Sequence, residues 1–307
     1  MKPTILMKTQ ILAQFLLVLE ICNSQTTLST DYPYLRNVKV GVITRHDVSA
    51  GIFTYNYTLH NDSTSSGSIE EFIIDISRST NSMALDTTGL KFNGTFSEGH
   101  FRRRYLEIGN SIVPISFSSL PRHWLGLYGN ALTASLSKDT LFVIPRESAT
   151  GLVIMSRGLP GIRKFTVKPD FNIYEFFPDE EDTTSQMTQF QEDSILAAVN
   201  FHGQTVGPSA PPVKFIVGAF LDTLSSLVKQ SYAFEWITSQ TTANKYLSYF
   251  GSAKSSLQSN NISGVSATLQ TVLKDVNVDS SRNLTNEAYA LIRYNTEYLI
   301  AHLPLHK

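Results

Sequence analysis

The spacing of apolar residues changes once along this chain, near Pro212, and this change limits the folds that it can adopt. Between Ile52 and Leu59, for example, every second residue is aromatic or leucine. Such period-two alternation is typical of a half-buried β-strand. After Pro212 the apolar residues recur at steps of three and four, which is typical of amphipathic helices. The sequence therefore predicts a multidomain α+β chain with a β-rich N-terminal part and a helical C-terminal part.

Short β-rich runs separated by turn residues fill the region from Arg36 to Lys168. The run Ile52 to Leu59, the turn cluster His60 to Ser68 and the run Ile69 to Ile76 together predict a hairpin. Glycine and proline punctuate the runs at the spacing of an all-β fold, and we predict a β-sandwich-like domain over residues 26–176. Further strands are expected at Gly89 to Phe96, Ser111 to Phe117, Thr140 to Ile144, Thr150 to Ser156 and Ile162 to Val167.

A connector is predicted over residues 177–213, between the two parts of the chain. It includes the acidic run Asp179 to Asp182, which offers oxygen ligands for Ca²⁺ but has neither EF-hand spacing nor an internal glycine, so we interpret it as solvated. The segment Gly203 to Pro212 is rich in glycine and proline, which resist both helix and sheet ladders. Between them, Asp193 to Asn200 fits either a short helix or a last strand.

Four amphipathic helices are predicted within residues 214–307. Thr285 is a plausible N-cap of the last helix, and Glu287 falls in its first turn, where the helix dipole favours an acid. The polar connections at 258–261 and 279–283 are short, so successive helices should lie antiparallel. We therefore predict an antiparallel four-helix bundle. The apolar stripes run from Phe215 to Val228, Ala243 to Leu257, Ile262 to Val276 and Ala288 to Leu299.

Residues 1–24 have the features of an export signal. Two lysines precede an apolar run from Ile11 to Ile21, and small residues up to Ser24 form a cleavage site. The apolar run is shorter than the roughly 20 residues that span a bilayer, so no integral membrane anchor is expected. Signal cleavage would release the mature protein into the periplasm or the extracellular space.

Cys22 is the only cysteine of the chain. Lipidation at Cys22 is disfavoured, because Glu20 and Ile21 stand where a lipoprotein signal has small residues. Removal of the signal then leaves no disulfide, thiol nucleophile or thiolate metal site, which fits a protein exported by a bacterium. The 25 basic and 26 acidic residues nearly balance, so no nucleic-acid partner is expected.

Signatures of catalysis are missing from the sequence. The seven histidines include no His-Glu-x-x-His pair, and Gly-x-Ser-x-Gly is absent. The Ser-x-x-Lys tetrads that begin at Ser135 and Ser226 lack the companion motifs of penicillin-binding enzymes. We predict no enzymatic activity, no metal site and no cofactor. The alternative is a hydrolase with dispersed residues, in which His100 or His123 would meet a carboxylate and a serine.

Four residues are candidates for ligand contact. Trp124 stands in a loop-like context beside Gly126, where its ring could stack on a sugar, and Tyr128 follows it. Arg102 and Arg104 would share one face of a strand, where guanidinium groups recognise carboxylates or phosphates. The structural alternatives are buried rings and charges that protect a sheet edge.

The last third of the chain resembles the FIMAH module, a small helical unit at the C-termini of secreted and surface bacterial proteins. Segments 158–163 and 203–212 resemble stretches that accompany such modules, so the resemblance covers the chain from about Ser156 onward. It implies a helical fold, export and an accessory role, and it carries no catalytic residues. The matching residues are Phe220-Leu221-Asp222, Tyr232, Trp236-Ile237, Asn260-Asn261, Leu284 to Leu291 and Glu297 to Ile300.

Taken together, these features predict a non-enzymatic exported accessory or adhesion protein. Its partner would be an extracellular protein or a glycan. A carbohydrate-binding module is an alternative, and an exposed aromatic surface around Trp124 would distinguish it.

Overall fold

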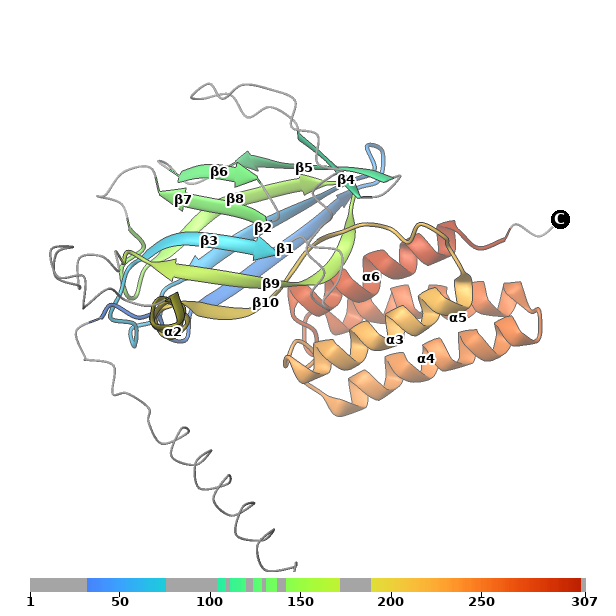
Figure 1. The fold of residues 1–307 in the computed structure, drawn as a ribbon. Coiled ribbons are helices and arrows are strands. Elements are labelled where there is room, and N and C mark those ends of the chain that lie inside the picture. The colour runs from blue at the N-terminus through green and yellow to red at the C-terminus, as the bar shows by residue number, and fades with distance from the viewer. Residues whose placement is uncertain are drawn as a thin grey trace, which may run out of the picture.

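A computed structural model describes residues 32–75, 142–171 and 189–304, and the backbone of four strands between residues 104 and 136. Figure 1 shows two β-sheets beside a group of C-terminal helices. The described part is mixed α+β, as the change in apolar spacing predicts. The predicted signal at 1–24, the predicted strand Gly89 to Phe96, the acidic run at 179–182 and Arg102 lie outside the described residues.

The first sheet has five antiparallel strands in the order β1-β2-β8-β5-β4. The aromatic residues of β2 are buried, as their alternation predicts. At the turn from β1 to β2, the Asp47 carboxylate accepts hydrogen bonds from the backbone N–H groups of Ser49 and Ala50, which fixes the turn. The strands are β1 Lys39–Asp47, β2 Ile52–His60, β8 Ser148–Ser156, β5 Ser111–Ser119 and β4 Arg104–Ile108.

The second sheet also has five antiparallel strands, in the order β10-β9-β3-β7-β6. Its strands are β10 Phe201–Ser209, β9 Leu159–Pro169, β3 Ile69–Asp75, β7 Ala131–Leu136 and β6 Trp124–Tyr128. The strands predicted at Ser111 to Phe117, Thr150 to Ser156 and Ile162 to Val167 correspond to β5, β8 and β9. The run predicted at Thr140 to Ile144 contributes one isolated bridge, from Val143 to Ile69.

The hairpin predicted from Ile52 to Ile76 is wrong, because β2 and β3 belong to different sheets. The connection between them is held by Asn61, which is fully buried. Its side-chain amide donates to the backbone oxygens of Gly67 (2.9 Å) and Val143 (2.8 Å). These bonds fix the path of the connection, which leads from β2 in the first sheet to β3 in the second sheet.

The predicted connector contains two regular elements, α2 Gln189–Val199 and β10. The expectation that Gly203 to Pro212 avoids a sheet is therefore wrong as far as Ser209, since every residue of β10 is paired with β9. The glycines there serve close packing. A Cβ on Gly203 would lie 2.5 Å from the Phe165 ring. For Asp193 to Asn200 the sequence leaves helix and strand open, and the structure has a helix there, α2, which ends at Val199.

The C-terminal helices are consistent with the predicted bundle. Each helix packs against the next, and α3 also packs against α6. Ser239 and Asn261 cap α4 and α5 through their side-chain oxygens. Thr285 is the N-cap residue of α6 as predicted, but its side chain makes no cap hydrogen bond. The helices are α3 Val217–Ala233, α4 Gln240–Gln258, α5 Ile262–Asp279 and α6 Asn286–Ala301.

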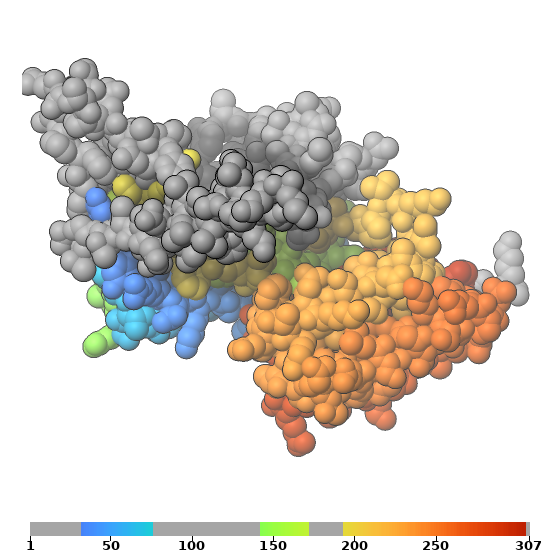
Figure 2. Space-filling model, turned by 60° about the horizontal axis from the view of Figure 1, so that its bottom comes forward, coloured from blue at the N-terminus to red at the C-terminus, as the bar shows by residue number. Residues whose placement is uncertain are grey.

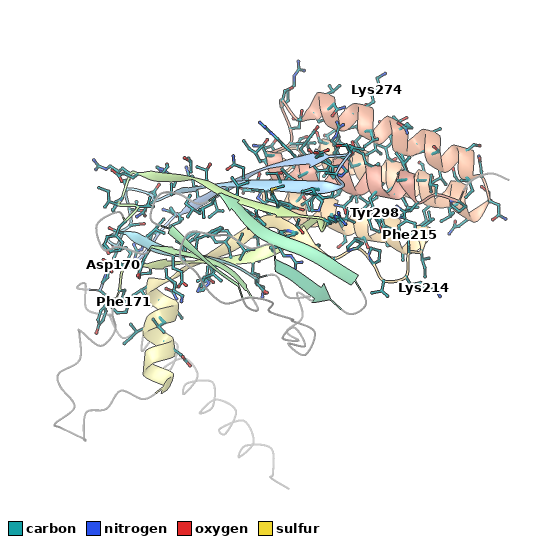
Figure 3. All side chains as sticks on the ribbon, turned by 90° about the horizontal axis from the view of Figure 1, so that it is seen from above. Asp170, Phe171, Lys214, Phe215, Lys274 and Tyr298 are labelled. Atoms are coloured by element: carbon teal, nitrogen blue, oxygen red, sulfur yellow. The ribbon has the colours of Figure 1, made fainter. Side chains whose placement is uncertain are left out.

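The β-rich and helical parts share one continuous core of buried side chains. Between the sheets, Tyr57 of β2 contacts Phe72 of β3, with ring centroids 5.7 Å apart, and its hydroxyl donates to the Val206 oxygen of β10. The helical residues form a lobe beside the β-rich part (Figure 2). In the segment that enters α3, Phe215 turns its ring toward Tyr298 of α6, at 5.7 Å (Figure 3). None of the helices described is long and apolar enough to cross a membrane.

Candidate functional site

Three of the four predicted ligand-contact residues lie on terminal strands of the two sheets. Trp124 and Tyr128 are the first and last residues of β6, and Arg104 is the first residue of β4. The loop-like context predicted for Trp124 is therefore wrong. The glycine that suggested a loop, Gly126, is paired with Ala134 inside the strand. Arg102 lies outside the described residues.

The sheet order places these three residues on one side of the β-rich part. Each sheet has two terminal strands, β1 and β4 in the first and β10 and β6 in the second. β1 and β10 contact each other, so β4 and β6 lie on the opposite side (Figure 1). Arg104, Trp124 and Tyr128 come from different parts of the sequence, and the topology brings them to this side, which we call the β4–β6 edge.

The side formed by β1 and β10 is covered by helix α6, which contacts β1, β9 and β10. β1 is a terminal strand, so one row of its backbone groups has no neighbouring strand to bond. The Glu287 carboxylate accepts a hydrogen bond from the Val42 N–H (3.1 Å), and the Tyr294 hydroxyl donates to the Thr44 oxygen (3.1 Å). The helix thereby supplies partners that a further strand would otherwise provide.

Other polar contacts extend the interface between α6 and the sheets. The Asn295 amide is buried and donates to the Pro160 oxygen at the start of β9 (2.9 Å). The His46 ring stacks on Phe53 at 4.1 Å, and its Nδ1 lies 4.0 Å from the Glu297 carboxylate. These contacts were not predicted from the sequence. The position of Glu287 in the first helical turn indicated a dipole contact, and no pattern indicated its strand partner.

A second polar cluster joins α4 to α5. The Lys245 ammonium lies 2.6 Å from Asp279 and 3.3 Å from Asp275. The Tyr246 hydroxyl donates to Asp279 and the Tyr249 hydroxyl donates to Asp275. Lysine and tyrosine at adjacent positions, followed on the next helix by two aspartates four residues apart, are a signal that sequence reasoning missed.

The electrostatics of this cluster favour the charged pair. Burial alone would raise the pKa of the Asp279 carboxyl, but hydrogen bonds from Lys245 and Tyr246 outweigh it, so the pKa lies below its ordinary value. Burial opposes the charge of Lys245 as well, yet the two aspartates raise its pKa. Burial and the hydrogen bond to Asp279 raise the pKa of Tyr246. The charged lysine and carboxylate are thus held as an ion pair.

Arg163 is a buried cation inside the β-rich part. Its guanidinium donates to the Pro208 oxygen through Nε (2.9 Å) and Nη2 (2.6 Å), and to the Ser209 hydroxyl (3.2 Å). Burial lowers the pKa of Arg163, while the nearby Asp75 opposes this effect. The side chain fastens the end of β10 to β9, which is a structural task.

The alternative of a hydrolase with dispersed residues depends on His100 or His123, and both lie outside the described residues. One Ser–His contact is described, from His60 Nδ1 to the Ser148 hydroxyl at 3.0 Å. These residues stand directly opposite each other on β2 and β8, so the contact is a cross-strand pair. Within the described ranges, no group of three or more acidic, histidine or cysteine side chains is placed to hold a metal ion.

Comparison with known proteins finds no matching family model, no matching curated protein and no matching solved structure. The resemblance of the last third to FIMAH modules therefore stays a prediction from the sequence.

Proposed function

We propose that this chain is a non-enzymatic exported protein that binds an extracellular protein or glycan through its β-rich part. The two sheets form a β-sandwich-like domain, and α3 to α6 form an antiparallel four-helix bundle that serves as a fixed accessory. One observation carries the proposal. Helix α6 covers the β1 edge with side chains that bond its backbone, while the opposite β4–β6 edge carries the three candidate contact residues.

The polar groups of the helical part support an accessory role. Glu287, Tyr294 and Asn295 bond backbone groups of the sheets, and Asp279 holds a lysine of its own bundle. Glutamate, aspartate and tyrosine side chains often perform acid–base chemistry. Here each is engaged in joining one element to another, which favours a structural use.

The composition of the β4–β6 edge supports ligand contact there. Tryptophan, tyrosine and arginine are the residues most enriched where proteins bind their partners, because each combines a large apolar area with hydrogen-bonding groups. Trp124 and Tyr128 stand two strand repeats apart, so a ligand that follows β6 would meet both positions. A glycan fits this arrangement, since sugars combine apolar faces with hydroxyl groups.

A glycan array with the purified mature protein tests this proposal. The wild type is compared with Trp124→Ala and with Tyr232→Ala, which removes an exposed ring from the helical part. We expect binding that is lost in Trp124→Ala and kept in Tyr232→Ala. Binding that survives in Trp124→Ala would contradict the assignment to the β4–β6 edge, and no binding to any glycan would contradict a glycan ligand.

A further inference from the structure

The turn that joins α3 to α4 contains a strained residue that lies between two aromatic residues in the sequence. Glu235 has φ +61°, in the left-handed region, where glycine or asparagine is the ordinary choice at the end of a helix. Phe234 precedes it and Trp236 follows it. A bulky acidic residue in this conformation costs free energy, and such outliers gather where a ligand is held.

Backbone hydrogen bonds hold this turn in one conformation. The Glu235 N–H donates to the Tyr232 oxygen (3.1 Å), and the Trp236 N–H donates to the Ser231 oxygen (2.8 Å). The Trp236 oxygen in turn accepts from the Thr285 N–H (2.9 Å) at the start of α6. The aromatic side chains therefore stand on a backbone that is already ordered, so little conformational entropy would be lost when a ligand binds.

The rings of this turn are accessible to solvent. Tyr232 and Phe234 are each 38% exposed, and Trp236 is half-buried, with part of its ring packed against the core. The Phe234 and Trp236 rings lie 5.2 Å apart and are inclined by 55° to each other. We call Tyr232, Phe234, Glu235 and Trp236 the aromatic corner.

Among the described residues, no basic side chain lies within 4.0 Å of the Glu235 carboxylate. Glu235 is exposed, and the ion pairs found within the described ranges all involve other acidic residues. Likewise, the cations found over aromatic rings in those ranges lie over Tyr34, Tyr246 and Tyr289. The corner thus combines electron-rich ring faces with an unpaired negative charge.

We propose that the aromatic corner binds an organic cation of the quaternary ammonium class. Ring faces attract such cations through their quadrupoles, and the carboxylate of Glu235, which stands between the two ring-bearing residues in the sequence, adds a direct charge interaction. The inclination of the rings favours a compact cation over a sugar, because a pyranose stacks on one plane while a spherical ammonium group touches two inclined faces. The site lies on the helical part and is independent of the β4–β6 edge, so each can fail alone.

Choline titration of a Trp124→Phe protein tests the proposal directly. The chain has two tryptophans, so this variant leaves Trp236 as the single indole signal in a nitrogen–proton NMR spectrum. The matched probe is dimethylbutanol, which has the shape of choline without the charge. In phosphate buffer we expect choline to shift the Trp236 indole signal with a dissociation constant on the order of millimolar, and the alcohol to leave it in place.

Two substitutions test the contributions of the charge and of the rings to choline binding separately. Glu235→Gln removes the charge and Phe234→Leu removes a ring while keeping apolar volume, and each should weaken choline binding by about fivefold or more. Glu235→Gly also removes the charge and should weaken binding at least as much as Glu235→Gln, but it should raise the melting temperature by about 2 °C or more, because glycine accepts a positive φ. The proposal is overturned if dimethylbutanol binds as well as choline, if Glu235→Gln binds unchanged, or if tens of millimolar choline shifts nothing.

Discussion

Glu287 shows how one side chain can serve two elements at once. It stands in the first turn of α6, where the helix dipole favours its charge, and it accepts the Val42 N–H of β1. The residue is only 8% exposed. Removal of its oxygen would leave a buried N–H without a partner, and such a group costs about 1–3 kcal/mol.

Two substitutions of Glu287 should therefore differ in cost. Glu287→Gln keeps an oxygen that can accept the Val42 N–H, so we expect a loss of less than about 1 kcal/mol in the free energy of unfolding. Glu287→Ala leaves the N–H unpaired and should cost about 1–3 kcal/mol. Urea denaturation of the three proteins measures both. Equal losses for the two variants would contradict the role assigned to this hydrogen bond.

Asp279 should stabilise the helical part in a manner that depends on pH. Its pKa in the folded protein lies below the ordinary value of 3.8, so the stabilisation is present above pH 3.8 and is lost as the pH falls through the folded pKa. Asp279→Asn should lower the free energy of unfolding by roughly 1–3 kcal/mol at pH 7. The difference from wild type should shrink toward pH 3.

Asp222→Asn is the matched control for this prediction. Asp222 pairs with Lys254 at the same 2.6 Å, but both side chains are largely exposed, at 62% and 42%. An exposed ion pair contributes at most about 1 kcal/mol. A control that destabilises the protein as much as Asp279→Asn would show that burial is not what gives the Asp279 pair its strength.

At the scale of elements, β10 depends on glycine for close packing. A Cβ at Gly203 would lie 2.5 Å from the Phe165 ring, whereas a Cβ at Gly41 of β1 would meet nothing within 4 Å. We expect Gly203→Ala to cost about 1–3 kcal/mol through overpacking. Gly41→Ala should be neutral or slightly stabilising, because alanine loses less backbone entropy on folding. Thermal unfolding of the two variants compares them, and a neutral Gly203→Ala would refute the packing argument.

The elements differ in how far the sequence could predict them. The helices follow from apolar stripes, because Leu224, Phe250, Leu269 and Leu291 face a core that their own spacing defines. β10 could not be predicted, since its glycines and proline resemble those of a connector, and the close neighbour of Gly203, Phe165, comes from another strand. The chain path after β2 was missed because it depends on the contact of Asn61 with Val143.

In the candidate site, too, local sequence could predict some features, while others depend on tertiary contacts. Residue type and local context indicated Trp124, Tyr128 and Arg104, although the loop expected at Trp124 is a strand, and the sheet order places all three on one edge. The coverage of the opposite edge could not be predicted, because Glu287 and Val42 are far apart in sequence and meet only in the folded chain. Contacts of this kind follow from tertiary structure and leave no local pattern.

At the scale of the whole molecule, the β-rich and helical parts are joined by a common core and by buried hydrogen bonds. A helical part joined in this way covers the β1 edge, and we expect this contact to persist in solution. Terminal strands with open backbone groups tend to pair with other chains, and covering them with a helix prevents this. We therefore propose opposite roles for the two edges of the β-rich part: the β1 edge is closed by α6, and the β4–β6 edge contacts a ligand.

Hydrogen exchange of the Val42 amide tests this account most directly. The amide stands on a terminal strand and donates to the Glu287 carboxylate of α6. If α6 is permanently docked, Val42 should exchange as slowly as the Tyr57 amide of the neighbouring strand, and Glu287→Ala should speed it selectively. Exchange of Val42 at the rate of an exposed loop amide, with Tyr57 still protected, would show that the helical part does not stay on the β1 edge and would contradict the account.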